Sequence, residues 1–349
     1  MEFAFTDEQC MIAETARIFF ADQATSERTR AVMEGEGFDR VLWTSFCAEM
    51  GMGGLALPET LGGAGLGMVE FAAVAEAAGA QVAALPLPGL AMVAAALLEG
   101  GSAALQSEYL PRIAAGELVA ACSADFVREG VGDRLSGTAR FVAYGGVADL
   151  FLLCGETCAW LVPADAKGVA IEKFVTMDQT RPLAHVVLSD VEAISLGDAT
   201  GIAAARAGWL CLAAEALGGA QAAIDRTVAY ALERKQFGRA IGSFQAYKHR
   251  LADRVVDLEQ ARSAVYWAAC ALDEGSDEAD LALHAAKSFA ADTFFRCAAD
   301  MVQLHGGIGF TWEHDAHLFL KRARGTQSAL GSGDWHREQV AALMLGEAA

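Results

Sequence analysis

Residues 231–253, ALERKQFGRAIGSFQAYKHRLAD, are the most informative part of the sequence for the fold, because they join two long helical patterns. After it, apolar residues recur every three or four positions, and the same spacing returns further along the chain. These residues are Phe244, Tyr247, Leu251, Val255, Leu258, Val265 and Leu272, then Leu283, Ala286, Ala290, Phe294, Cys297 and Met301. Helices of this length predict an antiparallel bundle over residues 199–349.

Before this bundle the sequence changes to short β-prone runs separated by glycines. The runs are FLLC at 151–154, WLV at 160–162 and HVVL at 185–188. Runs of this length between turn residues predict strands. We expect a small antiparallel β domain over residues 119–198.

The first 118 residues predict helices. Thr6 and Gln9 have the spacing of a capping box, so a helix should begin there. Further helical segments are expected at 39–50, 68–79, 88–99 and 103–115. An N-terminal helical domain, a central β domain and a C-terminal bundle make an α+β fold.

Charge and cysteine usage exclude several classes of function. A formal net charge of −19 repels phosphate backbones and anionic lipids, which argues against a nucleic-acid or membrane-surface role. The uncharged stretch 81–98 contains Pro86 and Pro88, which favours a loop and a buried helix over a membrane span. Eight cysteines without a CxxC pair indicate reduced thiols in a cytoplasmic protein.

Two groups of residues have the chemistry of an anion or cofactor site. Arg234 follows a predicted helix, where its guanidinium can pair with a pyrophosphate. Gly306 and Gly307 let backbone amides approach a ligand, and Gln303 lies one helical turn earlier. The simpler alternatives are a surface ion pair for Arg234 and an ordinary helix cap and turn for the glycines.

Residues 231–253 resemble the signature of acyl-CoA dehydrogenases, in which an Arg-Lys-x-Phe-Gly stretch precedes a Phe-Gln pair. The stretch QLHGGIGFTWEHDAHLFLKRAR, residues 303–324, resembles that family's Gln-x-x-Gly-Gly-x-Gly segment. Residues 42–67 and 110–117 are also similar to the family. The resemblance implies that the C-terminal region is a four-helix bundle, that it assembles into dimers of dimers and that it holds the FAD of a neighbouring subunit. It implies FAD contacts from Arg234, Gln236, Phe237, Gln245, Gln303, Gly306 and Gly307.

The family's carboxylate base is missing from both of its usual places. The match LGSGDWHR, residues 330–337, puts Leu330 where most members have glutamate, and leucine cannot accept a proton. The less common position, on the first bundle helix, corresponds to Gly208 or Trp209. Glu215 and Asp334 are the nearest acids, each one to two helical turns away.

The flavin-binding loop of the family is also altered. Its counterpart here is CSADFVREGVGDRLSG, residues 122–137, which is shorter than the usual Thr-Glu-Pro and Gly-Ser-Asp loop. Both departures resemble the smaller, non-catalytic subunit of heteromeric acyl-CoA dehydrogenases of steroid side-chain degradation. In such α₂β₂ enzymes a companion chain supplies the base.

The leading hypothesis is therefore a subunit that clamps a partner's FAD during α,β-desaturation of an acyl-CoA. The implied electron acceptor is an electron-transfer flavoprotein. Three alternatives stay open: a self-sufficient homotetramer with its base at Glu215 or Asp334, a flavin monooxygenase on the same fold, and a non-enzymatic assembly subunit.

Histidines and tryptophans near the Gly-Gly turn permit other interpretations. His305, His314 and His317 lack a recognised set of accompanying metal ligands, so we expect packing or capping roles and no metal. Trp312, Trp335 and His336 are candidates for a pocket lining or for packing at helix ends.

Overall fold

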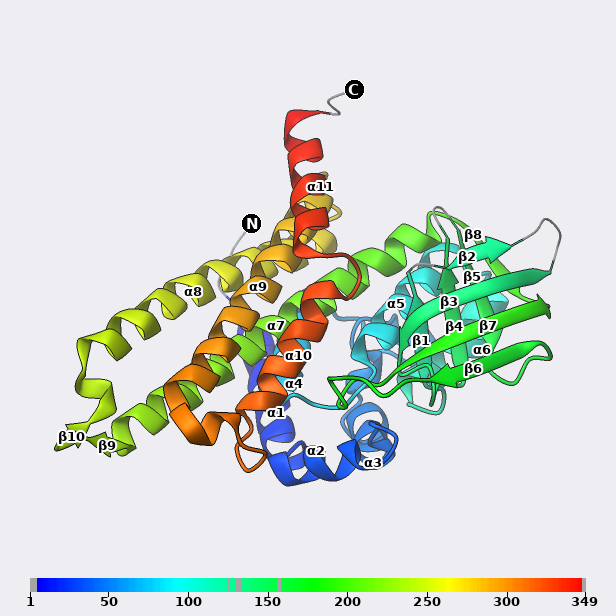
Figure 1. The fold of residues 1–349 in the computed structure, drawn as a ribbon. Helices are drawn as coiled ribbons and strands as arrows, with labels where there is room; N and C mark the ends of the chain where they lie inside the picture. Colours follow the sequence, from blue (N-terminus) through cyan, green and yellow to red (C-terminus); the bar gives the residue numbers. More distant parts are fainter. Residues whose placement is uncertain (1–4, 125, 130–133, 156–157, 347–349) are drawn as a thin grey trace. The chain divides into compact units, whose positions relative to one another are not determined.

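The structure, a computed structural model, describes residues 5–124, 126–129, 134–155 and 158–346 (Figure 1). The chain forms two compact units. The helical unit comprises Met1–Ser26, Ala72–Ala83 and Leu212–Ala349, and the mixed unit comprises Glu27–Phe71 and Ala84–Cys211. Helices, then a small β region, then long helices follow one another along the chain, which confirms the predicted α+β class.

Long helices dominate the helical unit. α1 begins at a capping box, as predicted: Gln9 N–H donates to Thr6 Oγ1 and Thr6 N–H donates to Gln9 Oε1. The elements that lie wholly or partly in this unit are α1 (Asp7–Gln23), α4 (Met68–Ala80), α7 (Thr200–Glu233), β9 (Lys235–Gln236), β10 (Arg239–Ala240), η4 (Ile241–Ser243), α8 (Gln245–Asp273), α9 (Ala279–His305), η5 (Gly306–Phe310), α10 (Ala316–Ser328) and α11 (Gly333–Leu345).

Among the described helices, α7 alone is long and apolar enough to cross a membrane. However, 94% of its most apolar window is buried inside the protein. This burial is that of a core helix.

The mixed unit combines short helices with two four-stranded sheets. The strand orders are β1-β4-β5-β8 and β2-β3-β7-β6. The helices are α2 (Ser26–Met33), α3 (Arg40–Thr44), η1 (Ser45–Glu49), η2 (Met52–Gly54), η3 (Glu59–Leu61), α5 (Leu87–Gly100) and α6 (Ala103–Ala114). The strands are β1 (Ala120–Ser123), β2 (Val127–Glu129), β3 (Leu135–Ala143), β4 (Leu150–Cys154), β5 (Cys158–Pro163), β6 (Val169–Lys173), β7 (Leu183–Val191) and β8 (Ile194–Asp198).

Most of the strand pairs are antiparallel, as predicted, but β1 and β4 run parallel, with Ala120 opposite Leu150. The prediction missed this pair because it came from local runs, which do not encode strand direction. α5 packs closely on β1, since a Cβ on Gly89 would lie 2.1 Å from the Ala120 carbonyl oxygen. The core of this β region is built from apolar side chains of both sheets, including Phe151, Leu153 and Val186.

Candidate functional site: the tip of the helical bundle

The β9–β10 hairpin carries an aromatic side chain on a strained turn. Its turn residues, Phe237 and Gly238, have positive φ angles of 53° and 77°. A type I′ turn requires two positive φ angles and favours Asn-Gly. The left-handed conformation costs a residue such as phenylalanine about 1–2 kcal/mol. Nevertheless Phe237 is 91% exposed, so the chain holds a strained aromatic residue toward solvent, as binding sites often do.

Phe244, the N-cap of α8, supports this hairpin. Its ring meets the ring of Phe237 edge-on, with centroids 6.1 Å apart. The guanidinium of Arg239 lies over the face of the Phe244 ring, 4.0 Å from the ring centroid. Gln245 follows as the exposed first residue of α8, where the helix dipole is positive.

Arg234 is the first residue after α7, as predicted, and it is exposed. Its carbonyl accepts from Ile241 N–H at 2.8 Å, which fixes the backbone on either side of the hairpin. None of the described acidic side chains lies within ion-pair distance of its guanidinium. The predicted alternative, a surface ion pair, is therefore absent from the described residues. The side chain of Gln236, by contrast, donates to the Lys235 carbonyl at 2.8 Å.

α9 ends in an open glycine turn. Gly306 is its C-cap with φ 65°, and its N–H bonds the Gln303 carbonyl. The capping role that we set out as the simpler alternative is thus present. A Cβ on either Gly306 or Gly307 would meet no atom within 4 Å. The backbone here is open to a ligand, beside the exposed side chain of Gln303.

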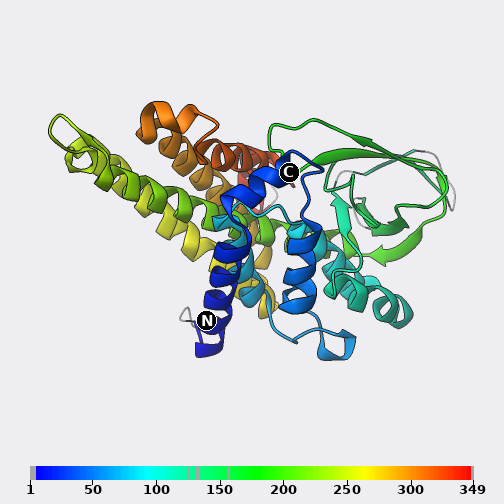
Figure 2. The ribbon, with the colours of Figure 1, turned by 90° about the horizontal axis from the view of Figure 1, so that it is seen from below.

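Two tyrosines join the helix ends. Tyr230 on α7 donates to the His305 carbonyl at 3.3 Å and stacks on that imidazole at 4.3 Å. Tyr247 on α8 donates to the Leu304 carbonyl at 3.2 Å. Figures 1 and 2 show the hairpin and the α9–α10 connection at the same end of the bundle. We call this end, residues 234–245 and 303–312, the bundle tip; it contains all seven residues predicted to contact FAD.

The bundle tip contains further exposed aromatic side chains. Phe310 is 86% exposed, and Trp312 lies under the ammonium of Lys321, 4.1 Å from its ring centroid. Sequence reasoning missed Tyr230, Tyr247 and Phe310. Their signal was weak, because isolated aromatic residues in helical patterns usually belong to the core.

Leu330, which the sequence comparison predicts to lie at the usual base position, belongs to the loop between α10 and α11. Its φ is 53°, and Gly331 follows at 103°. Lys287, fully buried on α9, donates its amine to the Thr326 carbonyl at 3.0 Å and to the Gly331 carbonyl at 3.5 Å. The Lys287 amine therefore stabilises the backbone of this loop through two hydrogen bonds. The loop residue at position 330 is an aliphatic leucine.

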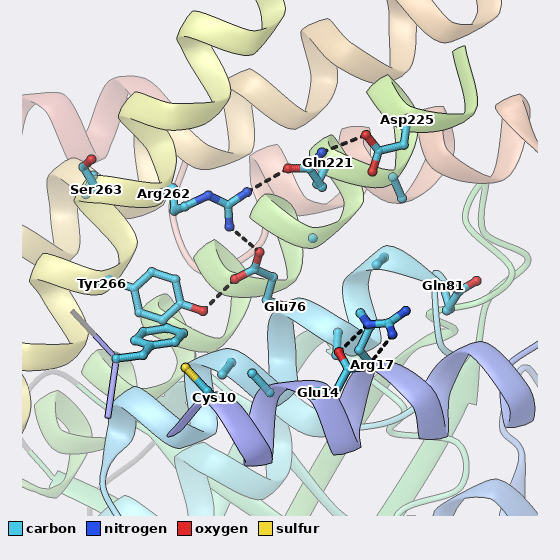
Figure 3. A pocket seen from close by; sticks show the side chains of 18 of the residues that line it. Cys10, Glu14, Arg17, Glu76, Gln81, Gln221, Asp225, Arg262, Ser263 and Tyr266 are labelled. Carbon is cyan, nitrogen blue, oxygen red and sulfur yellow. Dashed lines mark hydrogen bonds and ion pairs between the residues drawn. The ribbon is translucent and has the colours of Figure 1, made fainter. Parts of the chain in front are cut away.

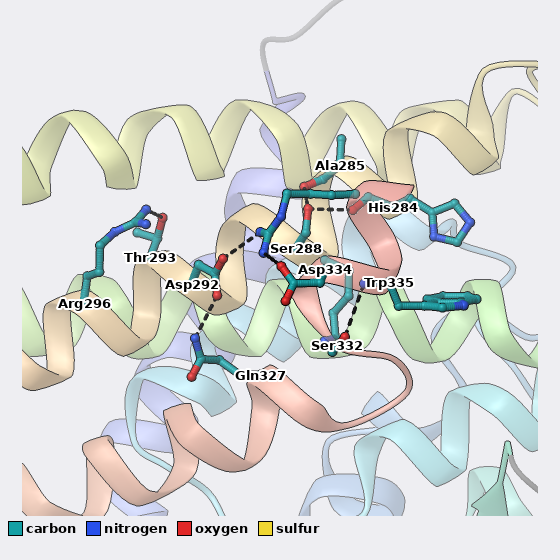
Figure 4. A network of polar contacts seen from close by, with 12 residues as sticks. His284, Ala285, Ser288, Asp292, Thr293, Arg296, Gln327, Ser332, Asp334 and Trp335 are labelled. Atoms are coloured by element: carbon teal, nitrogen blue, oxygen red, sulfur yellow. Dashed lines mark hydrogen bonds and ion pairs between the residues drawn. The ribbon is translucent and has the colours of Figure 1, made fainter. Parts of the chain in front are cut away.

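A buried histidine pair also supports this loop. His336 Nε2 lies 3.1 Å from the Leu330 carbonyl, and its Nδ1 lies 2.8 Å from His284 Nδ1. Because a carbonyl only accepts, Nε2 of His336 carries the proton and its Nδ1 accepts from His284. Burial, Lys287 and His284 lower the pKa of His336 to about 3. Trp335 packs edge-on against His284, so of the two earlier interpretations packing is the one observed (Figure 4).

The remaining base candidates lie in different surroundings. Gly208 and Trp209 are buried on α7. Glu215, also on α7, is 3% exposed. The carboxylate of Asp334 is on the surface, 92% exposed, and bonds Arg337 at 2.6 Å (Figure 4). Burial thus distinguishes Glu215 from Asp334.

The three histidines of the Gly-Gly region pack or cap. His305 Nδ1 donates to the Met301 carbonyl at 2.7 Å, and burial lowers its pKa. His314 Nδ1 accepts from Ala316 N–H, and His317 packs edge-on against Trp312. No group of three metal-ligating side chains occurs among the described residues.

The altered loop 122–137 is described only in part, because residues 125 and 130–133 lie outside the described residues. Of the rest, Cys122 Sγ and Cys154 Sγ are 3.7 Å apart, and burial raises the pKa of Cys122. The predicted loss of flavin contacts in this loop stays a prediction.

Comparison with known proteins gives consistent matches. Residues 6–117 match the family "Acyl-CoA dehydrogenase, N-terminal domain", and residues 202–345 match "Acyl-CoA dehydrogenase, C-terminal domain". The chain is 35% identical to Acyl-CoA dehydrogenase IpdE2 of Mycolicibacterium smegmatis, over 97% of this chain and 98% of that protein.

Solved structures match over nearly the full length. A chain of the ChsE4-ChsE5 complex from Mycobacterium tuberculosis has a TM-score of 0.92 and 31% identity, covering 100% of both chains. A chain of a Tcur3481-Tcur3483 steroid ACAD variant has a TM-score of 0.90 and 31% identity, covering 97% of this chain and 98% of that one.

Proposed function

The chain belongs to the acyl-CoA dehydrogenase family, and on that premise we propose that it is a subunit that holds part of a partner subunit's FAD at its bundle tip. The observation that carries this proposal is the gathering of the seven predicted contacts at one exposed end of the bundle. Separate parts of the chain, residues 234–245 and 303–307, contribute them.

The bundle tip fits a dinucleotide in three respects. Arg234 and its basic neighbours Lys235 and Arg239 place positive charge at one spot of a chain with net charge −19, where a pyrophosphate would be attracted. The open backbone at Gly306 and Gly307 can approach a flat or anionic group. Exposed Phe237 can pack against an aromatic ring.

FAD in this family accepts the β hydride of the thioester when it is bound. The proposed task of this chain is binding: Arg234 offsets phosphate charge, and the amides of Gln303, Gln236 and Gln245 supply hydrogen bonds. A carboxylate base is the part that the bundle tip and Leu330 do not supply. We therefore assign the base to the partner subunit, in an α₂β₂ assembly.

The proposed substrate is a bulky acyl-CoA, including steroid side-chain thioesters. One solved relative supports this assignment, since Tcur3481-Tcur3483 is a steroid ACAD. The ChsE4-ChsE5 relative is a complex of two different chains, which supports the partner subunit. An electron-transfer flavoprotein as electron acceptor and a cytoplasmic location complete the proposal.

The test is the FAD content of the chain purified alone and purified with the acyl-CoA dehydrogenase-like chain encoded beside it. We expect no flavin in the chain alone and stoichiometric FAD in the complex. Arg234→Gln should weaken FAD retention by the complex about tenfold, equivalent to about 1.4 kcal/mol. Arg324→Gln, which changes an exposed arginine on α10, is the matched control and should leave retention unchanged. Full FAD retention in the Arg234 variant would contradict the proposal.

Burial of Glu215 favours a second candidate function, a self-sufficient dehydrogenase with this residue as its base. That enzyme would bind FAD alone and bleach with an acyl-CoA in the absence of oxygen. Glu215→Gln would then abolish bleaching while flavin binding persists. If the lone chain is colourless, this second function is eliminated.

A further inference from the structure

The helical unit contains a cavity of about 1230 Å³ that the proposed function does not use. α1, α4, α7 and α8 line it (Figure 3). No residue of the bundle tip and no residue of the Leu330 loop is among the described residues that line it. It is thus separate from the site proposed for FAD.

Close contact between two of these helices explains part of its shape. A Cβ on Gly218 of α7 would lie 1.8 Å from the Glu76 carbonyl oxygen of α4. A Cβ on Gly79 would lie 2.0 Å from the Glu215 carbonyl oxygen. The α4 and α7 backbones therefore touch, while Ala77 and Ala222 on the same helices are too short to fill the space beside them. The result is a concave space between helices, of the size at which proteins bind small molecules and open to solvent along α1.

A polar network forms one wall of the cavity. The carboxylate of Glu76 accepts from Arg262 Nη1 and from Tyr266 Oη, each at 2.6 Å (Figure 3). The other arm of Arg262 donates to Gln221 at 2.8 Å. Burial and the charge of Glu76 raise the pKa of Tyr266, so its hydroxyl stays protonated and donates. These groups are already engaged with one another.

The charges around the cavity also balance. Three arginines and three acidic residues line it. Arg17 pairs with Glu14 at 2.5 Å, and Arg226 pairs with Asp315 at 3.1 Å. The carboxylate of Asp225 accepts from the Gln221 amide at 2.9 Å. A charged ligand would have to be desolvated without gaining a counter-charge.

We propose that this cavity binds a neutral, largely apolar small molecule. Its alanine and glycine walls, with the rings of Phe5, Tyr266 and Trp267, supply apolar contact, and its paired charges exclude anions. The phosphates of an acyl-CoA carry several negative charges and do not meet this requirement. The site shares no described residue with the bundle tip or the Leu330 loop, and the proposal does not rest on the proposed role in FAD binding.

The test uses the full chain, alone and in complex with its partner subunit, and Nile red as a neutral fluorescent probe. We expect saturable binding in both preparations. Dodecan-1-ol should displace the probe at least about tenfold better than dodecanoate, which has the same chain length and a negative charge.

Two filling variants locate the probe. Ala77→Leu and Ala222→Leu add bulk from different helices, and each should weaken binding about tenfold or more. Ala21→Leu, at an exposed position of α1, is the control and should bind as the parent does. Circular dichroism verifies that each variant is folded. If Ala77→Leu and Ala222→Leu weaken probe binding alike, the loss cannot be due to misfolding of a single variant.

Three results would overturn the proposal: equal displacement by the alcohol and the carboxylate, unchanged probe binding in both folded filling variants, or loss of binding when the partner is present. If the filling variants instead alter the sedimentation coefficient and no probe binds, the cavity is a surface that another chain covers.

Discussion

Lys287 shows how one buried side chain supports the loop that carries Leu330. Its amine bonds two carbonyls, those of Thr326 and Gly331, and has no exposed surface. The loop carries two consecutive positive φ angles, at Leu330 and Gly331. The hydrogen bonds from Lys287 to these two carbonyls compensate for the strain of that backbone.

Lys287→Met should lower the free energy of unfolding by about 1–3 kcal/mol, because it leaves buried carbonyls without a donor. Urea denaturation at neutral pH measures the difference. Lys248→Met, at an exposed position of α8, should change stability by less than about 0.5 kcal/mol. Equal effects of the two substitutions would show that the amine is not needed.

The His284–His336 pair predicts a loss of stability in acid. The folded-state pKa of His336 is about 3, below the ordinary value of 6.5. The unfolded chain therefore binds a proton first as the pH falls, and stability declines between about pH 6.5 and 3. The slope from this residue is about 1.4 kcal/mol per pH unit.

His336→Gln removes this proton uptake but keeps a polar side chain. Denaturation at pH 7.5 and pH 5 should show a smaller acid-induced loss in the variant than in the parent. Carboxylates contribute equally to both proteins, so they cancel in the comparison. Parallel pH profiles would contradict the assignment.

At the scale of single elements, one substitution in the β9–β10 hairpin should change protein stability and FAD binding in opposite directions. Phe237→Asn suits a type I′ turn and should raise stability by up to about 1 kcal/mol. The same change removes the exposed ring and should weaken FAD retention by the complex. Thermal unfolding and flavin content measured on one preparation test both directions. A variant that lost stability and kept its flavin would refute this account.

The contact between α4 and α7 is equally specific. Gly218→Ala should destabilise the protein by about 1–3 kcal/mol, because the new methyl group meets the Glu76 carbonyl. Gly307→Ala has open space around it and should be nearly neutral in stability. Urea denaturation compares the two. If the two variants were equally stable, α4 and α7 could move apart at little cost in free energy.

For the whole molecule, the net charge of −19 predicts a dependence on salt. Self-repulsion within a compact acidic protein is screened at moderate ionic strength. The Tm at pH 7.5 should rise when sodium chloride is added. At pH 5, where protonation reduces the negative charge, the rise should be smaller. No change at either pH would show that repulsion does not limit stability.

The division into domains at 118 and 198 stays a prediction, since the compact units of the molecule combine segments from distant parts of the chain. Changes in hydrophobic period predict where secondary structure changes. They do not predict which helices pack together, as the pairing of residues 72–83 with the C-terminal helices illustrates.

Residues close together in the chain were sufficient to predict the α+β class, the capping box at Thr6 and the motifs that identify the family. The assignment of Leu330 to the base position stays a prediction. Three features became visible with the folded chain: Tyr230 and Tyr247 bond the end of α9, Phe237 is strained and exposed, and a cavity remains beside the α4–α7 contact. These features depend on how helix faces meet across long sequence separations, which no local pattern encodes.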